Sequence, residues 1–277
     1  MENQRIIEEA IIKENQLIKR LKSFNKVLVA FSGGVDSTYL LALAQEALEK
    51  NCKAVFARGP MISSHEEKET LAMVKHFNLS VEVIDLDILT LEGFRENSPN
   101  RCYFCKKKLF ETFLDYSKRS GYSTVIDGTN ASDTEDYRPG RIALQELGVI
   151  SPLLEVDLTK TEIRLLSKRR HLPTWNKPSM ACLASRVPFG DTITAELLQR
   201  IAHAESILHD KGYVECRVRV HHDIARIEIP IDNFSAFLQH STEITNSILK
   251  LGFKFVTLDL MGLRSGSLNP TQQEDIE

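Results

Sequence analysis

The chain has 277 residues, of which 42% are hydrophobic and 26% charged, and a formal net charge of -3. This composition is that of a globular protein, the length suggests two domains at about 150 residues each, and the slightly negative charge argues against a protein that grips long nucleic acid by its phosphates. No apolar run approaches the roughly 18 residues that cross a bilayer, and the first residues lack the pattern of a signal peptide, so we expect a cytoplasmic protein without a membrane partner.

The first elements that the sequence predicts are a helix, a buried strand and a second helix. Residues 2 to 23 place Ile7, Ile11, Ile18 and Leu21 near one face, which is typical of an amphipathic helix. Residues 27 to 31 form a continuous apolar run, as in a buried parallel strand, and residues 38 to 44 have a helical composition. A strand-to-helix turn is therefore expected between them.

That turn, residues 32 to 37, has the sequence Ser-Gly-Gly-Val-Asp-Ser. Gly33 and Gly34 allow the backbone to come close to a ligand, and the amides that open the next helix favour an anion. We therefore expect a phosphate-binding loop. It differs from a Walker loop because no Gly-Lys-Ser/Thr follows, so no lysine in the turn reaches for a terminal phosphate.

Three further strands are expected at residues 54–57, 81–85 and 124–127. They alternate with helices, one of them capped by Ser64 together with Glu67, and this alternation predicts an α/β fold with a parallel sheet and helices on both faces. Ligands of such sheets bind beyond the carboxyl ends of the strands. Arg58, after the second strand, and Gly128, after the fourth, are therefore expected near the loop.

Two more polar segments are candidates for the same site. Residues 127–130 and then Asp133 form a second polar strand end, although Gly-Thr-Asn is equally ordinary turn chemistry. Thr159 is a plausible helix cap, which places Lys160 near a helix N-terminus where it could meet a phosphate. A lysine that faces solvent explains Lys160 equally well.

A domain boundary near residues 188–191 divides the chain into residues 1–188 and 189–277. The second part is expected to contain a helix at 194–211, strands at 213–221 and 224–229, a helix at 232–250 and a strand at 253–260. This pattern predicts a smaller C-terminal α+β domain. In its first strand Val214, Cys216, Val218 and Val220 share one face, so Cys216 is expected in the core. The opposite, polar face carries Glu215, Arg217, Arg219 and His221. The polar tail after Asn269 is expected to be disordered.

Three of the five cysteines suggest chemistry. Cys102 and Cys105 are three residues apart at the start of a helix expected over residues 106–116, so their sulfurs lie on one side. Cys182 is in a segment flanked by proline and glycine, whereas Cys52 looks incidental. A structural zinc site lacks an evident fourth ligand, a redox pair is weak in this fold, and an iron-sulfur cluster with one open iron suits three cysteines. From spacing alone, zinc and the cluster remain balanced.

The loop sequence matches that of the ATP pyrophosphatase, or PP-loop, superfamily. This resemblance implies that ATP is split between its α and β phosphates, so that a substrate is adenylated and pyrophosphate leaves. Several further segments resemble the LarE family of sulfur transferases, which act in nickel-pincer cofactor biosynthesis. They are residues 127–130, 136–140, 175–177, 185–190, 217–221, 223–228 and 262–266.

The resemblance implies an adenine nucleotide alpha hydrolase-like fold and a homo-oligomer. It also implies adenylation of the carboxylates of pyridinium-3,5-biscarboxylic acid mononucleotide, followed by replacement of an oxygen by sulfur. One branch of the family uses a single sacrificial cysteine, but its expected position holds Ala181 here. Cys182 together with Cys102 and Cys105 resembles the three-cysteine branch, in which a four-iron four-sulfur cluster carries a sulfide from a sulfur donor. A single-cysteine mechanism at Cys182 is the alternative.

The resemblance also assigns the site residues. Those expected to bind ATP and pyrophosphate are Ser32, Gly33, Gly34, Asp36, Ser37, Arg58, Gly128 and Lys160. Asp36, with Asp133, would help to hold Mg²⁺, which takes hard oxygen ligands. Arg217, Arg219 and Arg264 are candidates for the phosphate or carboxylates of the substrate, or else form a basic rim or an oligomer interface. Trp175 and Tyr137 could stack on a ring or simply pack.

Other classes of protein fit parts of this pattern. A tRNA thiolation enzyme would share the loop and the cluster, but it should carry a basic RNA-binding surface. An amide-forming synthetase would need ammonia from glutamine, and the sequence shows no segment of the size of a glutaminase domain. A nucleotide sensor without catalysis would bind ATP and release no pyrophosphate.

Overall fold

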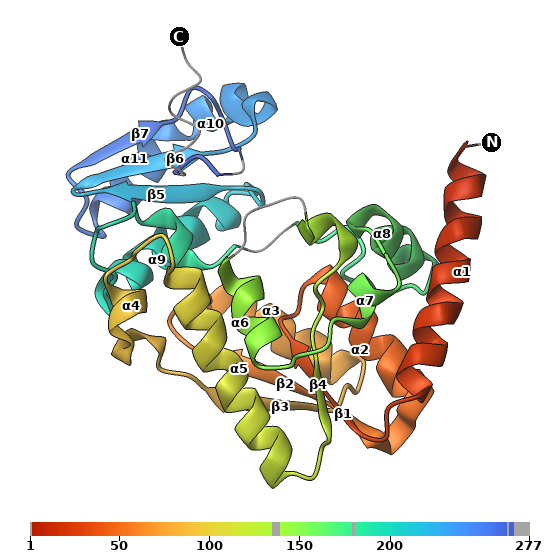
Figure 1. Ribbon diagram of the computed structural model, residues 1–277. Helices are drawn as coiled ribbons and strands as arrows, with labels where there is room; N and C mark the ends of the chain where they lie inside the picture. The colour runs from red at the N-terminus through yellow and green to blue at the C-terminus, as the bar shows by residue number, and fades with distance from the viewer. Residues whose placement is uncertain (1, 135–138, 179–180, 265, 269–277) are drawn as a thin grey trace. The chain divides into compact units, whose positions relative to one another are not determined.

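Figure 1 shows the computed structural model of the chain, which describes residues 2–134, 139–178, 181–264 and 266–268. The chain forms two compact units. The first unit comprises Met1–Gly59, Lys68–Leu86 and Cys102–Met180, and the second comprises Pro60–Glu67, Asp87–Arg101 and Ala181–Glu277. The division at residue 188 stays a prediction. The predictions made for Tyr137 and for the tail after Asn269 fall outside the described residues.

The first unit is built on a parallel sheet in the order β3-β2-β1-β4. Its strands are β1 (Val27–Phe31), β2 (Cys52–Arg58), β3 (Val81–Asp85) and β4 (Thr124–Ile126). Val29 is paired with Ala54 on one side and Ile126 on the other, so β1 is central and its carboxyl end faces the same edge as those of its neighbours. The expected parallel sheet is confirmed. β2 begins earlier than expected, so Cys52 is a buried strand residue.

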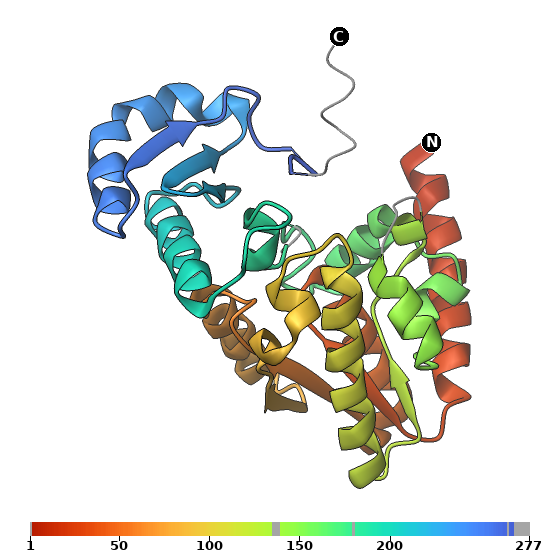
Figure 2. The same ribbon diagram turned by 60° about the vertical axis from the view of Figure 1, so that its left-hand side comes forward.

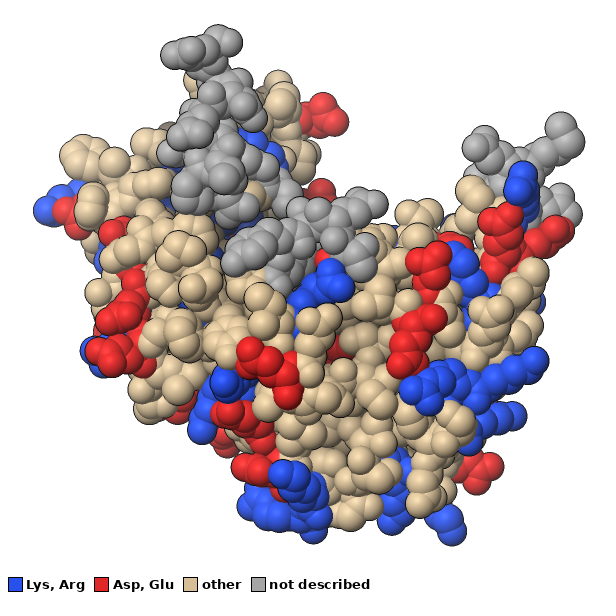
Figure 3. Space-filling view, in the orientation of Figure 1, with Lys and Arg blue, Asp and Glu red and all other residues tan. Residues whose placement is uncertain are grey.

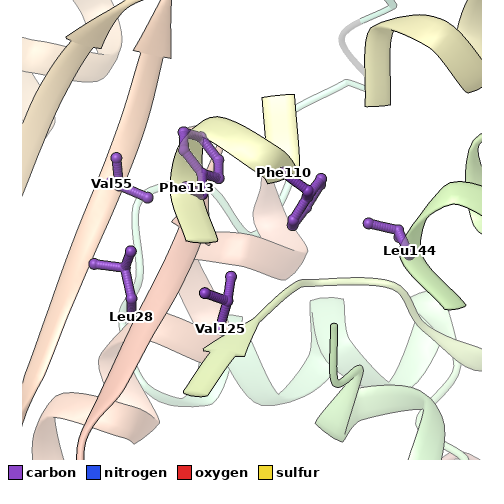
Figure 4. Packing of buried hydrophobic residues seen from close by; sticks show 6 residues of the cluster. All are labelled: Leu28, Val55, Phe110, Phe113, Val125 and Leu144. Carbon is purple, nitrogen blue, oxygen red and sulfur yellow. The ribbon is translucent and has the colours of Figure 1, made fainter. Parts of the chain in front are cut away.

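Helices cover both faces of this sheet (Figures 1 and 2). Those of the first unit are α1 (Glu2–Lys22), α2 (Val35–Leu48), α5 (Arg101–Arg119), α6 (Pro139–Glu146), α7 (Pro152–Glu155) and α8 (Lys160–Arg169), and α3 (Ser64–His76) runs from the second unit into the first. α5 and α6 pack on one face through the cluster in Figure 4, whose buried members are Leu28, Val55, Phe110, Phe113, Val125 and Leu144. α2 packs on the other face, with α1 and α8 against it.

The cap of α3 differs from the expected one. Ser63, not Ser64, accepts from the amide of Glu66 at 3.1 Å, and the Glu66 carboxylate accepts from the Ser63 amide at 3.3 Å. The reciprocal capping box is therefore shifted by one residue toward the N-terminus. Ser-Ser followed by Glu-Glu in the sequence fits both registers, and the structure selects the first.

The second unit has a sheet in the order β5-β6-β7. Its elements are α4 (Glu92–Arg95), α9 (Ala195–Asp210), β5 (Arg217–His221), β6 (Ile224–Glu228), α10 (Phe234–Gln239), α11 (Ser241–Leu249) and β7 (Phe255–Leu258). β6 is antiparallel to β5 and parallel to β7. The small α+β sheet is thus present, but the helix expected over 232–250 is broken at His240.

β5 is shorter than the strand expected over 213–221. Val214 precedes it and is 64% exposed, so its placement in the core was wrong, whereas Cys216 is fully buried as expected. Arg219 was expected on a polar face, yet it is only 6% exposed. A buried guanidinium requires acceptors, and these come from distant parts of the chain.

Among the described residues, no helix is long and apolar enough to cross a membrane. Acidic and basic side chains are intermixed over the face shown in Figure 3, in keeping with the net charge of -3.

Candidate active site

The loop between β1 and α2 is held by the serines at its two ends. The Ser32 amide donates to Ser37 Oγ at 3.1 Å, and the two hydroxyl oxygens are 3.0 Å apart. Ser37 Oγ also donates to the Gly34 carbonyl at 3.3 Å. Hydrogen bonds between residues five apart in the sequence therefore close the loop.

The two glycines of the loop have different roles. Gly33 has φ +74°, and a Cβ there would lie 2.4 Å from Thr70 Oγ1. Only glycine fits this position without strain. Gly34 is the N-cap of α2 with φ -81°, and a Cβ there would approach only Ser32 Oγ at 3.4 Å. No side chain caps α2, so its first amides are available to an anion.

Gly128 brings the end of β4 against this loop. A Cβ on Gly128 would lie 3.0 Å from the Ser37 amide nitrogen and 3.3 Å from the Asp36 carbonyl carbon. The preceding residue is anchored, because the buried Asp127 carboxylate accepts from Thr129 Oγ1 at 2.5 Å and Ser151 Oγ at 2.6 Å. The structure thus brings Gly128 to the loop, as the strand-end argument predicts.

Asp36 and Lys160 form an ion pair at the same place, between Asp36 Oδ2 and Lys160 Nζ. Asp36 Oδ1 is buried and has no hydrogen-bond partner among the described residues. Burial raises the pKa of Asp36, the Lys160 charge opposes this, and the Asp133 carboxylate adds to the rise. Lys160 therefore faces the loop rather than standing alone in solvent.

Local structure places Lys160 there. Thr159 caps α8 in a reciprocal box with Glu162, whose Oε2 accepts from the Thr159 amide at 2.8 Å. The Lys160 amide donates to Ser132 Oγ at 3.0 Å. The expected Thr159 cap is confirmed, and it starts α8 beside the loop.

Arg58, the remaining residue expected at the ATP site, pairs with Asp85. Its Nε and Nη2 donate to the two oxygens of Asp85 at 2.6 and 3.0 Å, and this pair lowers the pKa of Asp85. These residues end β2 and β3. The role of Arg58 in binding ATP stays a prediction.

The three candidate cysteines lie in different units. Cys102 is exposed and Cys105 half-buried in the first turns of α5, within the first unit, and Cys182 is exposed in the second unit. Burial raises the pKa of Cys52 to about 12 and raises that of Cys216 still further. Within the described parts of the chain, no group of three His, Cys, Asp or Glu side chains is placed to hold a metal ion.

Arg186 and Glu205 are two buried residues that the sequence reasoning missed. Arg186 Nε and Nη2 donate to the Glu205 carboxylate at 2.8 and 3.1 Å. Burial alone would lower the pKa of Arg186, but the charge and the hydrogen bonds of Glu205 act together against it, and the pKa is raised. A signal for this pair was present. Glu205 falls at helical spacing among the buried Ile201 and Leu208 of α9, where an apolar residue would be expected.

The three substrate-arginine candidates are all in the second unit. Arg219 donates to Glu228 Oε2 at 3.1 Å and to the Ser185 carbonyl at 2.6 Å, and Arg264 donates to Asp259 at 3.1 Å. Burial, and then the charge of Arg186, lower the pKa of Arg217. Their roles stay predictions, because Arg219 and Arg264 already have acidic partners.

Trp175 lines a surface pocket of about 300 Å³ with residues of α8. Lys168 Nζ stands 4.6 Å from the centre of its ring. Arg164 donates to the carbonyls of Trp175 and Lys177 at 2.9 and 2.7 Å, which fixes this segment on α8. Packing and ring stacking both remain open for Trp175.

Comparison with known proteins agrees with this geometry. Residues 9–106 match the NAD synthase family, which supports the adenine nucleotide alpha hydrolase-like fold. The NH(3)-dependent NAD(+) synthetase of Wolinella succinogenes is 29% identical over 170 residues, which cover 57% of this chain and 64% of that protein. An uncharacterised protein of Synechocystis sp. is 39% identical over 247 residues, covering 88% of this chain and 92% of that protein.

The pyridinium-3,5-bisthiocarboxylic acid mononucleotide synthase of Lactiplantibacillus plantarum is 36% identical over 260 residues. The match covers 94% of this chain and 94% of that protein, so it includes both units. The chain therefore belongs to the LarE family of pyridinium-3,5-bisthiocarboxylic acid mononucleotide synthases, which confirms the resemblance of its motifs and the prediction of an ATP-dependent enzyme.

Proposed function

We propose that this enzyme adenylates the carboxylates of pyridinium-3,5-biscarboxylic acid mononucleotide and converts them to thiocarboxylates. The observation that carries the proposal is the loop at residues 32–37 in a chain of this family. A hydrogen bond between Ser32 and Ser37 closes this loop, and no side chain caps the helix that follows, so the first amides of that helix can bind a phosphate. The turn contains no lysine that could contact the terminal phosphate. Membership of the family supports this choice of substrate.

The residues around the loop fit a magnesium ion. Asp36 Oδ1 is a buried oxygen without a hydrogen-bond partner in the described residues, and the charge of Asp133 reaches Asp36. Mg²⁺ is usually held by one or two carboxylates together with substrate phosphates. Asp36, with Asp133, would hold the ion, and the ion would neutralise charge on the phosphates. Lys160, which pairs with Asp36, would then also pair with a phosphate oxygen.

The proposed reaction has two steps. A carboxylate oxygen of the substrate attacks the α-phosphorus of ATP, and pyrophosphate leaves. A sulfur nucleophile then attacks the acyl carbon, and AMP leaves with the former carboxylate oxygen. The amides of α2 and Lys160 would stabilise the negative charge that moves onto pyrophosphate.

For the sulfur source we favour a four-iron four-sulfur cluster held by Cys102, Cys105 and Cys182. These are the two exposed cysteines and the half-buried one, whereas Cys52 and Cys216 are buried, and burial raises the pKa of both thiols. When bound, such a cluster would supply a sulfide on an iron that no protein ligand occupies. A cytoplasmic location, a separate sulfur donor and a homo-oligomer stay predictions.

Arg217, Arg219 and Arg264 are proposed to bind the phosphate or the carboxylates of the substrate. Burial lowers the pKa of Arg217 and Arg219, and the nearby Arg186 charge lowers both further, so an added anion would relieve their repulsion. Glu228 raises the pKa of Arg219 and offsets part of the effect.

The test is to incubate the enzyme anaerobically with ATP, Mg²⁺, sulfide and the biscarboxylate mononucleotide. We expect AMP, pyrophosphate and a product in which sulfur has replaced oxygen, as measured by chromatography and mass spectrometry. ADP and phosphate as products, or thiocarboxylate formed without ATP, would refute the proposal.

The cysteines are tested one at a time. Cys102→Ala, Cys105→Ala and Cys182→Ala should each lose the cluster absorbance and sulfur transfer while adenylation persists. Cys52→Ala and Cys216→Ala serve as controls and should keep both. If Cys182 alone is needed and its mass falls by that of hydrogen sulfide after turnover, the sacrificial mechanism replaces the cluster.

A further inference from the structure

The segment that carries Cys182, residues 181–186, is wrapped around a buried guanidinium. Arg186 at its end is only 2% exposed. Its Nη1 donates to the carbonyl oxygens of Ala181 at 2.7 Å and Cys182 at 3.1 Å, and to Ser185 Oγ at 2.9 Å. One nitrogen therefore gathers three acceptors of this segment, including the backbone of Cys182 itself.

Glu205 fixes that guanidinium from the opposite side. Its two oxygens accept from Nε and Nη2 of Arg186, and Oε1 also accepts from the Val218 amide at 3.0 Å. Glu205 lies on α9 and Val218 on β5, so regular elements orient the carboxylate. A bidentate pair of this kind sets the direction of the guanidinium as well as its position.

Further contacts hold the segment at separate points. The Leu183 amide donates to the Met61 carbonyl at 3.0 Å, and Ser185 Oγ donates to the Cys182 carbonyl at 2.7 Å. Arg219 Nη1 donates to the Ser185 carbonyl at 2.6 Å. The Cys182 residue is nevertheless exposed. The segment thus combines an anchored backbone with an exposed cysteine. A side chain that takes part in a reaction needs both, because it must be held in place and must be accessible to the reacting atom.

A purely stabilising ion pair would not need this arrangement. Buried ion pairs often contribute no more stability than apolar residues of the same size. Here the one guanidinium nitrogen that does not face Glu205 makes all three contacts with residues 181–185. The pair with Glu205 therefore orients Nη1 of Arg186 toward the backbone that carries Cys182.

We infer that Arg186, oriented by Glu205, is a positioning residue that sets where the Cys182 thiol is presented. The inference rests on the proposed function only in giving Cys182 a part in sulfur transfer. The placement of the backbone by Arg186 is tested separately from that role.

The experiment compares Arg186→Lys and Ser185→Ala with the wild-type enzyme. Lys211→Ala, which breaks an exposed ion pair with Glu243 in the same unit, is the matched control. Amide hydrogen exchange of the peptide spanning residues 181–187 reports the backbone. Pyrophosphate release and thiocarboxylate formation report the two steps of the reaction.

A lysine cannot bind both oxygens of Glu205 and three acceptors of the segment. Arg186→Lys should therefore raise exchange at residues 181–187 by about tenfold, the effect of one lost hydrogen bond to a charged group. Thiocarboxylate formation should fall by at least the same factor while pyrophosphate release is kept. Ser185→Ala should show a smaller change of the same kind, and Lys211→Ala none.

Unchanged exchange in Arg186→Lys, or an equal loss of both reaction steps, would overturn the inference. If the wild-type enzyme forms no thiocarboxylate, the proposed function fails, but the exchange measurement still decides the positioning. If Arg186→Lys does not fold, Arg186→Met combined with Glu205→Gln removes both buried charges together. If amide exchange at residues 181–187 in that double variant were as slow as in the wild-type enzyme, the inference would also be rejected.

Discussion

The loop at residues 32–37 of the first unit and the arginine region of the second unit, around Arg186, Arg217 and Arg219, are built in opposite ways. The loop closes through Ser32 and Ser37, five residues apart, and offers backbone amides that carry no formal charge. The arginine region depends on pairs between residues distant in sequence. Arg186 reaches Glu205 over 19 positions, and Arg219 reaches Ser185 over 34.

This difference determines what a substitution does in each region. A change in the loop alters the shape of the backbone, so its effect falls first on the proposed phosphate site. A change in the arginine region can leave a buried charge without its partner, so stability and binding change together. The following variants separate the two cases, beginning with the largest effect.

Gly33→Val should eliminate AMP formation and destabilise the fold. Its φ of +74° and the overlap with Thr70 both oppose a side chain, and the left-handed conformation alone costs about 1–2 kcal/mol. Gly34→Val is the matched variant, because its φ of -81° is ordinary. It should lower the free energy of unfolding less than Gly33→Val does, because only the N-cap preference for glycine is lost. It should nevertheless lose ATP binding, since a side chain blocks the approach to phosphates. Wild-type ATP affinity in Gly34→Val, measured by calorimetry, would exclude the loop as the phosphate site.

Arg217→Ala and Arg219→Ala should both weaken substrate binding by about tenfold or more, as expected for a lost charge-assisted contact. Arg219→Ala should also lower the free energy of unfolding, by about 3 kcal/mol. Glu228, which is fully buried, loses one partner in that variant but keeps Arg226. ATP affinity should stay nearly unchanged in both variants and in the double variant. An equal loss of ATP and substrate affinity would reject the assignment.

Thr159→Ala removes the cap that begins α8 beside the loop. It should lower the free energy of unfolding by about 1 kcal/mol and raise the KM for ATP, because Lys160 is the next residue. Ser63→Ala removes a comparable cap in the second unit and should have a similar effect on stability only. Urea unfolding and steady-state kinetics measure both quantities. If Ser63→Ala also raised the KM for ATP, the effect of Thr159→Ala would come from the loss of a helix cap in general and not from the position of Lys160.

Cys52→Ala should change the response to alkali. Burial raises the pKa of Cys52 to about 12, so the folded state holds this proton more tightly than the unfolded chain does. The resulting stability is complete below the ordinary thiol pKa of about 8.5 and is lost as the pH rises toward about 12. Cys52→Ala should therefore show a shallower loss of stability above about pH 9. Equal slopes for the variant and the wild-type enzyme would contradict this.

The comparison also explains what the sequence could predict. The parallel strands, the loop and the Thr159 cap follow from short segments, because apolar runs, glycine pairs and caps act over a few residues. Even there, Ser63 and Ser64 fit the same cap pattern, and tertiary contacts decided between them. The pairing of Lys160 with Asp36 was open because it joins residues 124 positions apart.

The second unit was less predictable for the same reason. Alternation placed Cys216 and Val218 in the core but also put Val214 there, since the pattern does not show where β5 begins. It put Arg219 on a polar face, and the partners that allow its burial come from Glu228 and Ser185. No local sequence pattern predicts a buried guanidinium whose hydrogen-bond acceptors lie elsewhere in the chain.

The central claim is that the loop activates a carboxylate which then exchanges oxygen for sulfur. It is tested most directly with substrate whose carboxylates carry heavy oxygen, incubated with ATP, Mg²⁺ and sulfide under anaerobic conditions. Attack of the carboxylate on the α-phosphorus predicts that AMP contains the heavy oxygen and that pyrophosphate contains none, by mass spectrometry. Unlabelled AMP beside the thiocarboxylate product, or heavy oxygen in inorganic phosphate beside ADP, would contradict the account.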